Sequence, residues 1–456
     1  MKSKTERIGT DFTQGNIPRV LLLFLAPFLL SSILNSIYNM VDMVIVGRVM
    51  GSSGTVAVSM GGRMLTLFTN ANTALAGGGQ ILIAQQLGAG EKQRVNTSVG
   101  TLFTLLLIMS CIMCAFCLIA SGAILNWLNT PTESFSQART YLCITSVGLP
   151  LISGYNAVCS VLRGMGDSRR PLLFIAVATG ANLMLDLLFI CVFSLGAGGA
   201  ALATVIGQGM AFALSLRILY REREKFGFDF KLRSFLPDGS SVHTILDIGV
   251  PNAAHGFIIS ITQLFLVGYV NAFGLAAAAA WSVGDKIISF TNIMSTSVRQ
   301  AGGAIVAQNI GAQKYNRVQG LVRSAVVLTT GFACVLSVVC LLFPHVLFGL
   351  FTKDAAVLAY SRSFMAIASL AFLVSALSAG FACVTIGSGN AKLMFIAGIL
   401  DGFVLRLMFS FWLGIQWNMG VTGFFLANSL ARLAPLLCHS CYYFSGAWKR
   451  RGRLMK

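Results

Sequence analysis

"AQQLGAGEKQRV", residues 84–95, and "AQNIGAQKYNRV", residues 307–318, share half of their letters at an offset of 223 positions. At the same offset, "RGMGDSRRPLLF" (163–174) lines up more loosely with "IGSGNAKLMFIA" (386–397). Similarity within one chain at a fixed offset is the signature of a repeated structural unit. The sequence therefore predicts two halves that are built alike.

The composition predicts the environment of both halves. Of the 456 residues, 56% are hydrophobic and 11% are charged, and the mean hydropathy is +0.78. Soluble domains carry about 25% charged residues, so this chain lacks the polar surface that water requires. We predict an all-α polytopic membrane protein with about twelve spans, each of the roughly 20 apolar residues that a bilayer crossing needs. The expected spans lie near 20–47, 55–84, 97–122, 141–163, 171–194, 197–219, 244–270, 275–304, 320–350, 360–388, 391–414 and 418–445.

The net charge of +18 follows the connections between spans. Basic residues gather in the N-terminal segment, in alternate connections and in the tail "KRRGRLMK", whereas the other connections hold few. Cytoplasmic loops are enriched in Lys and Arg, so we expect both termini to be cytoplasmic, in the plasma (inner) membrane of a cell. The basic tail could contact anionic lipid headgroups, and we expect no nucleic-acid partner.

An even number of spans gives the two halves the same orientation. Transporters are often built from such parallel repeats, with a substrate path between the halves. The predicted organisation is an N-terminal segment (1–19), an N-lobe (20–220), a charged linker (221–243), a C-lobe (244–445) and a basic tail (446–456).

Short motifs do not indicate an enzyme or a bound cofactor. "GGGQ" (77–80) lacks the GK[ST] of a phosphate loop, and "GAGGAA" (196–201) opens an apolar helix and not a βαβ unit. The three cysteines of "CIMCAFC" (111–117) have no His or acid near them and are expected to be small apolar residues of a membrane helix.

Acids inside spans are rare and mark functional sites. Those considered for a site are Asp42, Asp186, Asp285 and Asp401. At 1.5 Å of rise per residue, Asp42 lies about 9 Å inward from Arg48, and both Asp186 and Thr204 lie about 13 Å below the loop near residue 196. Asn182 shares a helical face with Asp186.

These oxygen-bearing side chains therefore fall in one layer. They could coordinate Na⁺ or share a proton, because two close carboxylates in a low dielectric cannot both stay ionised. Arg63 lies at about the same depth. It could instead pair with Asp42 or Asp186 as a structural ion pair, which would leave no ion site.

Two further groups of charged residues lie inside the predicted spans of the second half. Asp401 and Arg432 each lie about 20 Å below the outer end of their spans, which predicts a bridge between two helices or an Asp401 that titrates during transport. Arg406 follows Asp401 by five residues and would lie off that face of an α-helix. Asp285 and Lys286 are adjacent, so they should point apart.

Five stretches, in this order, resemble the multidrug and toxic compound extrusion (MATE) transporters. They are "APFLLSSILNSIYNMVDMVIVGRVMG", "AQQLGAG", "LRGMGDSRRPL", "NLMLDLLF" and "GAGGAALATVIGQ". The resemblance covers nearly the whole chain. It implies two six-helix lobes forming a V around a central cavity, and a secondary active antiporter that exports small organic, often cationic compounds in exchange for Na⁺ or H⁺ by alternating access. We expect a monomer.

The resemblance is strongest to the DinF-like branch of that family. That branch has an aspartate fifteen residues after a first-helix proline, as in Pro27 and Asp42. Its fifth-helix Asn-x-x-x-Asp matches Asn182 and Asp186, and its sixth-helix threonine matches Thr204. The resemblance implies that these residues couple transport to a cation and that Pro27 is a hinge, whereas a proline inside a membrane helix can also be a static kink.

Two observations limit the resemblance. The NorM-like branch has acids in its seventh and tenth helices, whereas residues 250–270 and 369–387 contain none. The alternative is a lipid-linked glycan flippase of the same broader superfamily. A flippase needs cationic side chains to hold a pyrophosphate, and few bases lie inside the predicted spans, among them Arg63, Lys286, Arg406 and Arg432.

Overall fold

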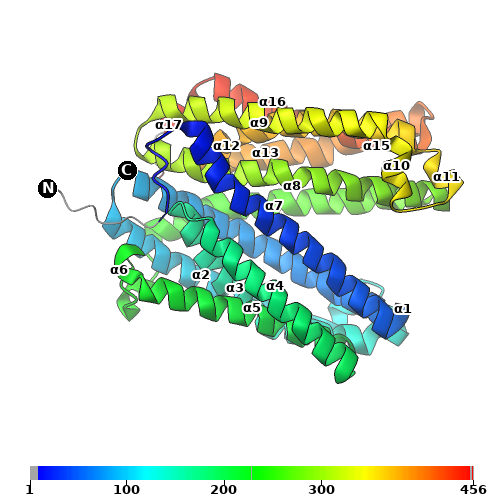
Figure 1. Cartoon of the computed structure of the whole chain (residues 1–456), viewed down its shortest axis with the longest axis horizontal. Coiled ribbons are helices and arrows are strands. Elements are labelled where there is room, and N and C mark those ends of the chain that lie inside the picture. The colour runs from blue at the N-terminus through cyan, green and yellow to red at the C-terminus, as the bar shows by residue number, and fades with distance from the viewer. Residues whose placement is uncertain (1–8, 227, 452–453, 455–456) are drawn as a thin grey trace. The chain divides into compact units, whose positions relative to one another are not determined.

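The computed structural model describes residues 9–226, 228–451 and 454. Over these residues the chain is helical and contains no strand, as predicted (Figure 1). The basic residues Lys2, Lys4 and Arg7, and part of the predicted basic tail, lie outside the described residues.

The long helices follow the predicted spans. The longest, α1 (Ile17–Gly88), is interrupted at Gly51, where φ is 68° and ψ is −161°. Only glycine adopts this conformation readily, so α1 forms two spans, 17–51 and 52–88. The other long helices are α2 (Lys92–Trp127), α3 (Thr132–Gly164), α4 (Arg169–Asp186) with η1 (Leu187–Val192), α5 (Gly196–Arg221), α7 (Gly239–Asn271), α8 (Leu275–Gly311), α9 (Tyr315–Leu342), α12 (Ser361–Gly387), α13 (Ala391–Gly398) with η3 (Ile399–Leu405), α14 (Arg406–Phe409) and η4 (Ser410–Gln416), and α15 (Gly420–Leu430) with α16 (Leu433–Phe444).

Ten helices in the described part of the chain are long and apolar enough to cross a membrane. Two further helices of similar length are residues 52–88, which carry Arg63, and α8, which carries Asp285, Lys286 and Arg299. With these two, the described helices match the twelve predicted spans. Short helices complete the chain: α6 (Arg223–Phe226), η2 (Leu232–Phe235), α10 (Pro344–Gly349), α11 (Ala355–Leu358) and α17 (Ala447–Arg451).

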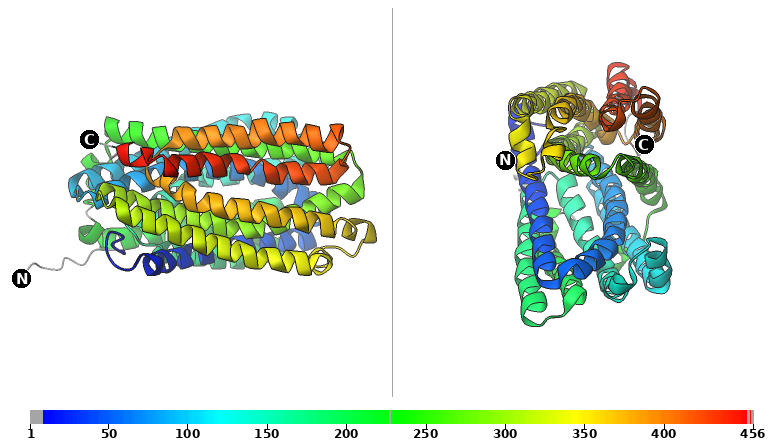
Figure 2. Two further views of the ribbon diagram at one scale, coloured as in Figure 1. Left: turned by 90° about the horizontal axis from the view of Figure 1, so that it is seen from above. Right: turned by 90° about the vertical axis from the view of Figure 1, so that its right-hand side faces the viewer.

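The helices group into two compact units. The first unit contains the described residues up to Asp11 and Ala26–Val250, and the second contains Phe12–Leu25 and the described residues from Pro251 onward. One division falls next to Pro27 in α1 and the other at Pro251 in α7. These two prolines are 224 positions apart, which is close to the offset of the sequence repeat. Within each unit the long helices run side by side (Figure 2).

The repeated motif holds an incoming chain segment in the second unit. The side chain of Gln308 accepts a hydrogen bond from the Phe12 N–H (2.7 Å), and Asn309 donates to the Phe12 carbonyl (3.1 Å). Arg317 donates to the carbonyls of Gln14 and Gly15. Gln308, Asn309 and Arg317 belong to "AQNIGAQKYNRV", so this copy of the motif anchors the segment that leads into α1.

The charged linker predicted over 221–243 is packed against α2. Phe228 is buried and its ring lies 6.4 Å from that of Phe103 and 5.2 Å from that of Phe235. The Thr104 hydroxyl donates to the Phe235 carbonyl (2.6 Å). At Gly100 a Cβ would lie 1.7 Å from the Ser234 carbonyl oxygen, so only glycine allows this close approach. The linker is therefore a folded part of the first unit.

The repeat extends to a local irregularity of the backbone. The π-helical turns η1 and η4 begin at Leu187 and Ser410, and these positions are separated by the same 223 residues as the sequence motif. A third π-helical turn, η3, occurs in the second half without a counterpart among the described elements of the first. π-helical turns in α-helices frequently mark functional sites.

Candidate ion-binding site

Three helices of the first unit bring the predicted site residues together. Asp42 lies on α1, Asn182 and Asp186 lie on α4, and Thr204 lies on α5. The carboxyl groups of Asp42 and Asp186 face each other closely enough to share a hydrogen bond when one of them carries a proton. The Asn182 side-chain amide donates to the Thr204 hydroxyl over 3.4 Å.

Several oxygens of this cluster have no protein partner. Asp186 is completely buried and Asn182 is 3% exposed. Within the described residues, both oxygens of Asp186, one oxygen of Asp42 and the amide oxygen of Asn182 are buried without a hydrogen bond. Leaving a buried acceptor unpaired costs about 1–3 kcal/mol, and more when it is charged. These unpaired oxygens could accept a cation or a proton.

The local structure explains how these oxygens converge. Asn182 and Asp186 are four residues apart on α4, so both project from one face. The Thr204 hydroxyl donates its proton to the Ala200 carbonyl one turn earlier (3.0 Å). Its lone pairs consequently face the side chains of α4. All of the donors are oxygens, the type of ligand that hard cations take, so the residues fit Na⁺ as well as H⁺.

Two tyrosines also belong to this cluster and were not predicted. The side chains of Tyr38 and Tyr141 interact with the Thr204 hydroxyl and lie near both carboxylates. Tyr38 precedes Asp42 by four residues, and this spacing could have revealed it in the sequence. Tyr141 comes from α3 and is 5% exposed, and no sequence spacing links it to the other residues.

Arg63 does not pair with the acids. Its side chain is exposed, and within the described residues it forms no ion pair with Asp42 or Asp186. The alternative of a structural ion pair, which would have left no ion site, is thus not what the structure shows.

Pro27 lies inside α1 without breaking it. In α1 the non-helical backbone conformation occurs at Gly51, and the Ser31 hydroxyl donates to the Pro27 carbonyl (2.7 Å). The Arg163 guanidinium lies 4.6 Å from the centre of the neighbouring Phe28 ring. The hinge role of Pro27 stays a prediction.

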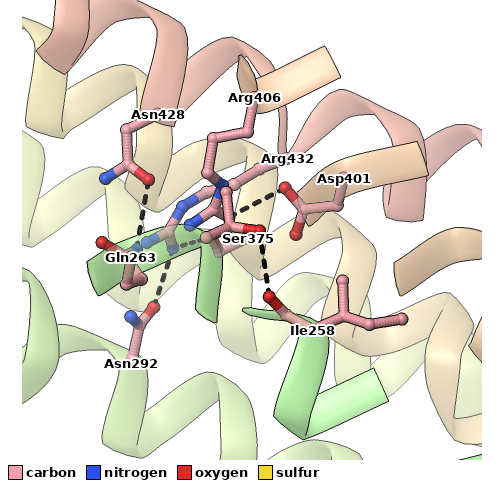
Figure 3. Close-up of polar contacts among 9 residues, drawn as sticks. Ile258, Gln263, Asn292, Ser375, Asp401, Arg406, Asn428 and Arg432 are labelled. Carbon is pink, nitrogen blue, oxygen red and sulfur yellow. Dashed lines mark hydrogen bonds and ion pairs between the residues drawn. The ribbon is translucent and has the colours of Figure 1, made fainter. Parts of the chain in front are cut away.

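The predicted bridge between Asp401 and Arg432 is wrong. Asp401 instead forms an ion pair with Arg406 (2.8 Å), and both side chains are buried. An α-helix would separate residues five apart, but Asp401 lies in η3, whose π-helical turns bond residue i to residue i+5 and place both residues on one face. Arg432 donates to Asn292 (3.1 Å) and Ser375 (2.8 Å) (Figure 3).

Asp285 and Lys286 separate as adjacent helical residues should. Both are exposed, and Lys286 lies 6.0 Å from the centre of the Phe351 ring. Asp285 lies within electrostatic range of Arg432 in the second unit.

Long apolar helices in two repeated halves, with an acidic cluster buried in the first unit, define a multi-pass membrane protein of the architecture that secondary transporters use. The sequence profile of the MatE family matches residues 27–188 and 251–412, one copy in each half. The chain therefore belongs to the MatE family, and the predicted resemblance is confirmed.

Named relatives and solved structures agree with this assignment. The chain is 26% identical to the probable multidrug resistance protein YoeA of Bacillus subtilis over 96% of both chains. It is 22% identical to the probable multidrug resistance protein NorM of Thermotoga maritima over 96% of this chain and 95% of that protein.

Two solved structures share the fold at 19% identity. One, described as MATE in the straight conformation, has a TM-score of 0.90 and is matched over 97% of this chain and 99% of that one. The other, described as the outward-facing conformation of a multidrug resistance MATE family transporter, has a TM-score of 0.88 and is matched over 98% and 99%.

Proposed function

We propose that the protein is a secondary active antiporter that exports organic, often cationic and amphipathic compounds in exchange for H⁺ or Na⁺. The observation that carries the proposal is the pair of buried Asp186 and half-buried Asp42 in the first unit, which has no ion-pair partner among the described residues. The relatives named as multidrug resistance proteins support the class of substrate.

The chemistry of the cluster supplies the coupling. Two carboxylates in a low-dielectric site cannot both stay ionised without a cation. A proton would be shared between Asp42 and Asp186, whereas Na⁺ would take oxygens from both carboxylates, from Asn182 and from Thr204. Release of that cation leaves the site with uncompensated negative charge, which a cationic substrate can relieve. Alternating access then exchanges the two across the membrane.

The charge of the connections supports an orientation. Basic residues concentrate in the N-terminal segment, in the tail and in alternate connections, including Lys92, Arg94 and the linker over 221–243. We propose that this side is cytoplasmic, that the membrane is the plasma (inner) membrane, and that the protein works as a monomer.

The glycan flippase is the weaker candidate. Arg406 is already neutralised by Asp401. A lipid-linked pyrophosphate carries at least two negative charges, so it needs more uncompensated cations than this arrangement supplies.

Transport by the purified protein in liposomes tests the proposal. Ethidium is supplied with a pH gradient or a Na⁺ gradient imposed separately, and dissipation of each gradient is recorded. We expect the natural protein to exchange ethidium for one of the two ions, and Asp42→Asn and Asp186→Asn to reduce exchange to the level of empty liposomes. Asp354→Asn is the matched control, because Asp354 is an exposed helix cap that accepts from the Ala356 N–H.

Two results would count against the proposal. If ethidium dissipates neither gradient in the natural protein, the antiporter assignment fails. If both aspartate variants keep gradient-driven efflux, the first-unit cluster has no part in coupling.

A further inference from the structure

The second unit contains a buried to half-buried polar cluster that ion coupling in the first unit does not use (Figure 3). Its side chains come from α7, α8, α12, η3, α14, α15 and the α15–α16 connection. They are Gln263, Asn292, Ser375, Asp401, Arg406, Asn428 and Arg432.

The charges of this cluster do not cancel. Asp401 neutralises Arg406, but Arg432 is held by two neutral oxygens, those of Asn292 and Ser375. Arg299 and Asp285 are the other charged groups that act on Arg432. Among the described residues of the second unit, three arginines and two aspartates thus lie within electrostatic range of one another, which leaves one positive charge in excess.

Donors of both guanidiniums remain without a protein acceptor. Nε and Nη1 of Arg406 and Nε of Arg432 are buried and make no hydrogen bond within the described residues. Arg406 is 2% exposed. A buried charged donor without an acceptor is costly, so these groups point to a ligand that supplies oxygens.

The backbone is interrupted at the same place. Pro435 lacks an N–H, and its ring displaces the carbonyl of residue 431, so α15 ends at Leu430 and Arg432 lies in the turn before α16. Asp401 and Arg406 lie in and directly after the π-helical turn η3. Substrate sites of transporters are typically formed where membrane helices are discontinuous.

We propose that this cluster binds the carboxylate of a transported organic compound through Arg432 and Arg406. A carboxylate is planar and matches the fork of an arginine. Its single negative charge equals the single positive charge in excess, whereas a phosphate monoester carries nearly two. Gln263 and Asn428, which bond to each other over 3.4 Å, add amide groups beside the two guanidiniums (Figure 3).

The inference rests on the proposed function only in that the bound compound is also exported. It assigns the carboxylate of a zwitterionic compound, which also carries a positive charge, to the second unit.

Binding to the purified full chain in a neutral detergent tests the site. The probes are norfloxacin, which has a carboxylate, and its methyl ester, which has none, titrated by their own fluorescence. We expect the natural protein to bind the acid more tightly than the ester. Arg432→Gln should weaken binding of the acid about tenfold, or about 1.4 kcal/mol, and leave binding of the ester unchanged.

Unchanged binding of the ester also shows that the variant is folded. Arg362→Gln, the same change at an exposed arginine of α12, is the matched control and should bind both probes as the natural protein does. Equal affinity of the natural protein for acid and ester, or an equal loss of both in Arg432→Gln, would overturn the assignment.

Two additional measurements separate the sources of failure. If short-chain phosphatidylglycerol displaces norfloxacin from the natural protein, the site takes a lipid headgroup and the assignment to a transported carboxylate is wrong. If the acid binds through Arg432 but neither probe is exported from liposomes under either gradient, the proposed function fails while the carboxylate site stands.

Discussion

The two halves share the same arrangement of helices, but the polar clusters inside them carry charge of opposite sign. In the first unit, Asp42 and Asp186 lie together without a basic partner among the described residues. In the second unit, Arg406 and Arg432 outnumber the single aspartate that pairs with them. Duplication has thus preserved the helices and the π-helical turn, whereas the charges that face the interior have diverged.

The repeat offset makes this divergence explicit. At 223 positions from Asp186 the second half has Phe409, and at the same distance from Arg406 the first half has Leu183. No charge of either cluster has a charged counterpart at the corresponding position. The difference teaches that the helical frame tolerates either sign of charge, provided that a partner or a ligand compensates it.

The largest expected effect is on the free energy of unfolding, which a variant of the second-unit cluster should lower and a variant of the first-unit cluster should not. Asp401→Asn leaves Arg406 buried and unpaired, and breaking a buried ion pair in this way typically costs about 3–5 kcal/mol. Asp186→Asn removes one of two facing carboxylates, so it should leave stability unchanged or raise it. Thermal unfolding of both variants in detergent checks this contrast.

The double variant Asp401→Asn, Arg406→Gln serves as the control, because it removes both charges and should recover most of the loss. Equal destabilisation by Asp401→Asn and Asp186→Asn would show that the two clusters do not differ in charge balance.

A second experiment sharpens the role of the first-unit oxygens. Thr204→Val keeps the shape of the side chain and removes its hydroxyl. If Na⁺ is the coupling ion, transport should need about tenfold more Na⁺, since a bond to a charged group is worth about 1.5–3 kcal/mol. If H⁺ is the coupling ion, transport should change little. Thr140→Val, at an exposed hydroxyl that bonds its own helix, is the control.

The unpredicted tyrosine gives a smaller effect. Tyr141→Phe removes a hydroxyl that interacts with Thr204 and should cost about 1 kcal/mol, seen as a few-fold change in the rate of gradient-driven efflux. Tyr220→Phe, at an exposed tyrosine outside the cluster, should change nothing. An unaltered rate in Tyr141→Phe would remove this residue from the site.

The smallest effect concerns the starts of α1 and α7. Hydrogen bonds from the Ser240 hydroxyl and the Ser241 N–H lower the pKa of Asp238, which caps α7. Asn16 caps α1 with a neutral amide, which accepts from the Arg19 N–H (3.2 Å). A lowered pKa stabilises the fold above the unfolded value of about 3.9. That stabilisation is lost as the pH falls through the folded value.

Asp238→Ala should therefore cost about 1 kcal/mol at pH 7 and less at pH 3, whereas Asn16→Ala should cost the same amount at both. Unfolding in denaturant at the two pH values measures the difference. A loss that is independent of pH in both variants would contradict the charged cap at Asp238.

The sequence was sufficient for the duplication, the spans and the residues of the acidic cluster. Apolar length and rare in-span acids are strong signals because a membrane excludes other solutions. It was insufficient for the partner of Asp401, because predicting Arg406 requires knowing that the helix is π-helical over Ile399–Leu405. Tyr141 was missed for a different reason, since only the packing of α3 against its neighbours brings it to Thr204.

The anchoring of Phe12 has a consequence for synthesis of the chain. Its hydrogen-bond partner Gln308 is 296 residues further along. The segment before Pro27 therefore emerges from the ribosome long before the part of the second unit that holds it. The start of the first helix therefore lacks these hydrogen-bond partners until most of the chain has been synthesised. The second unit includes residues 12–25 from the start of α1, and the first unit includes the start of α7 up to Val250. Either half made from a separate gene would therefore need the opening segment of the other half to complete its compact unit.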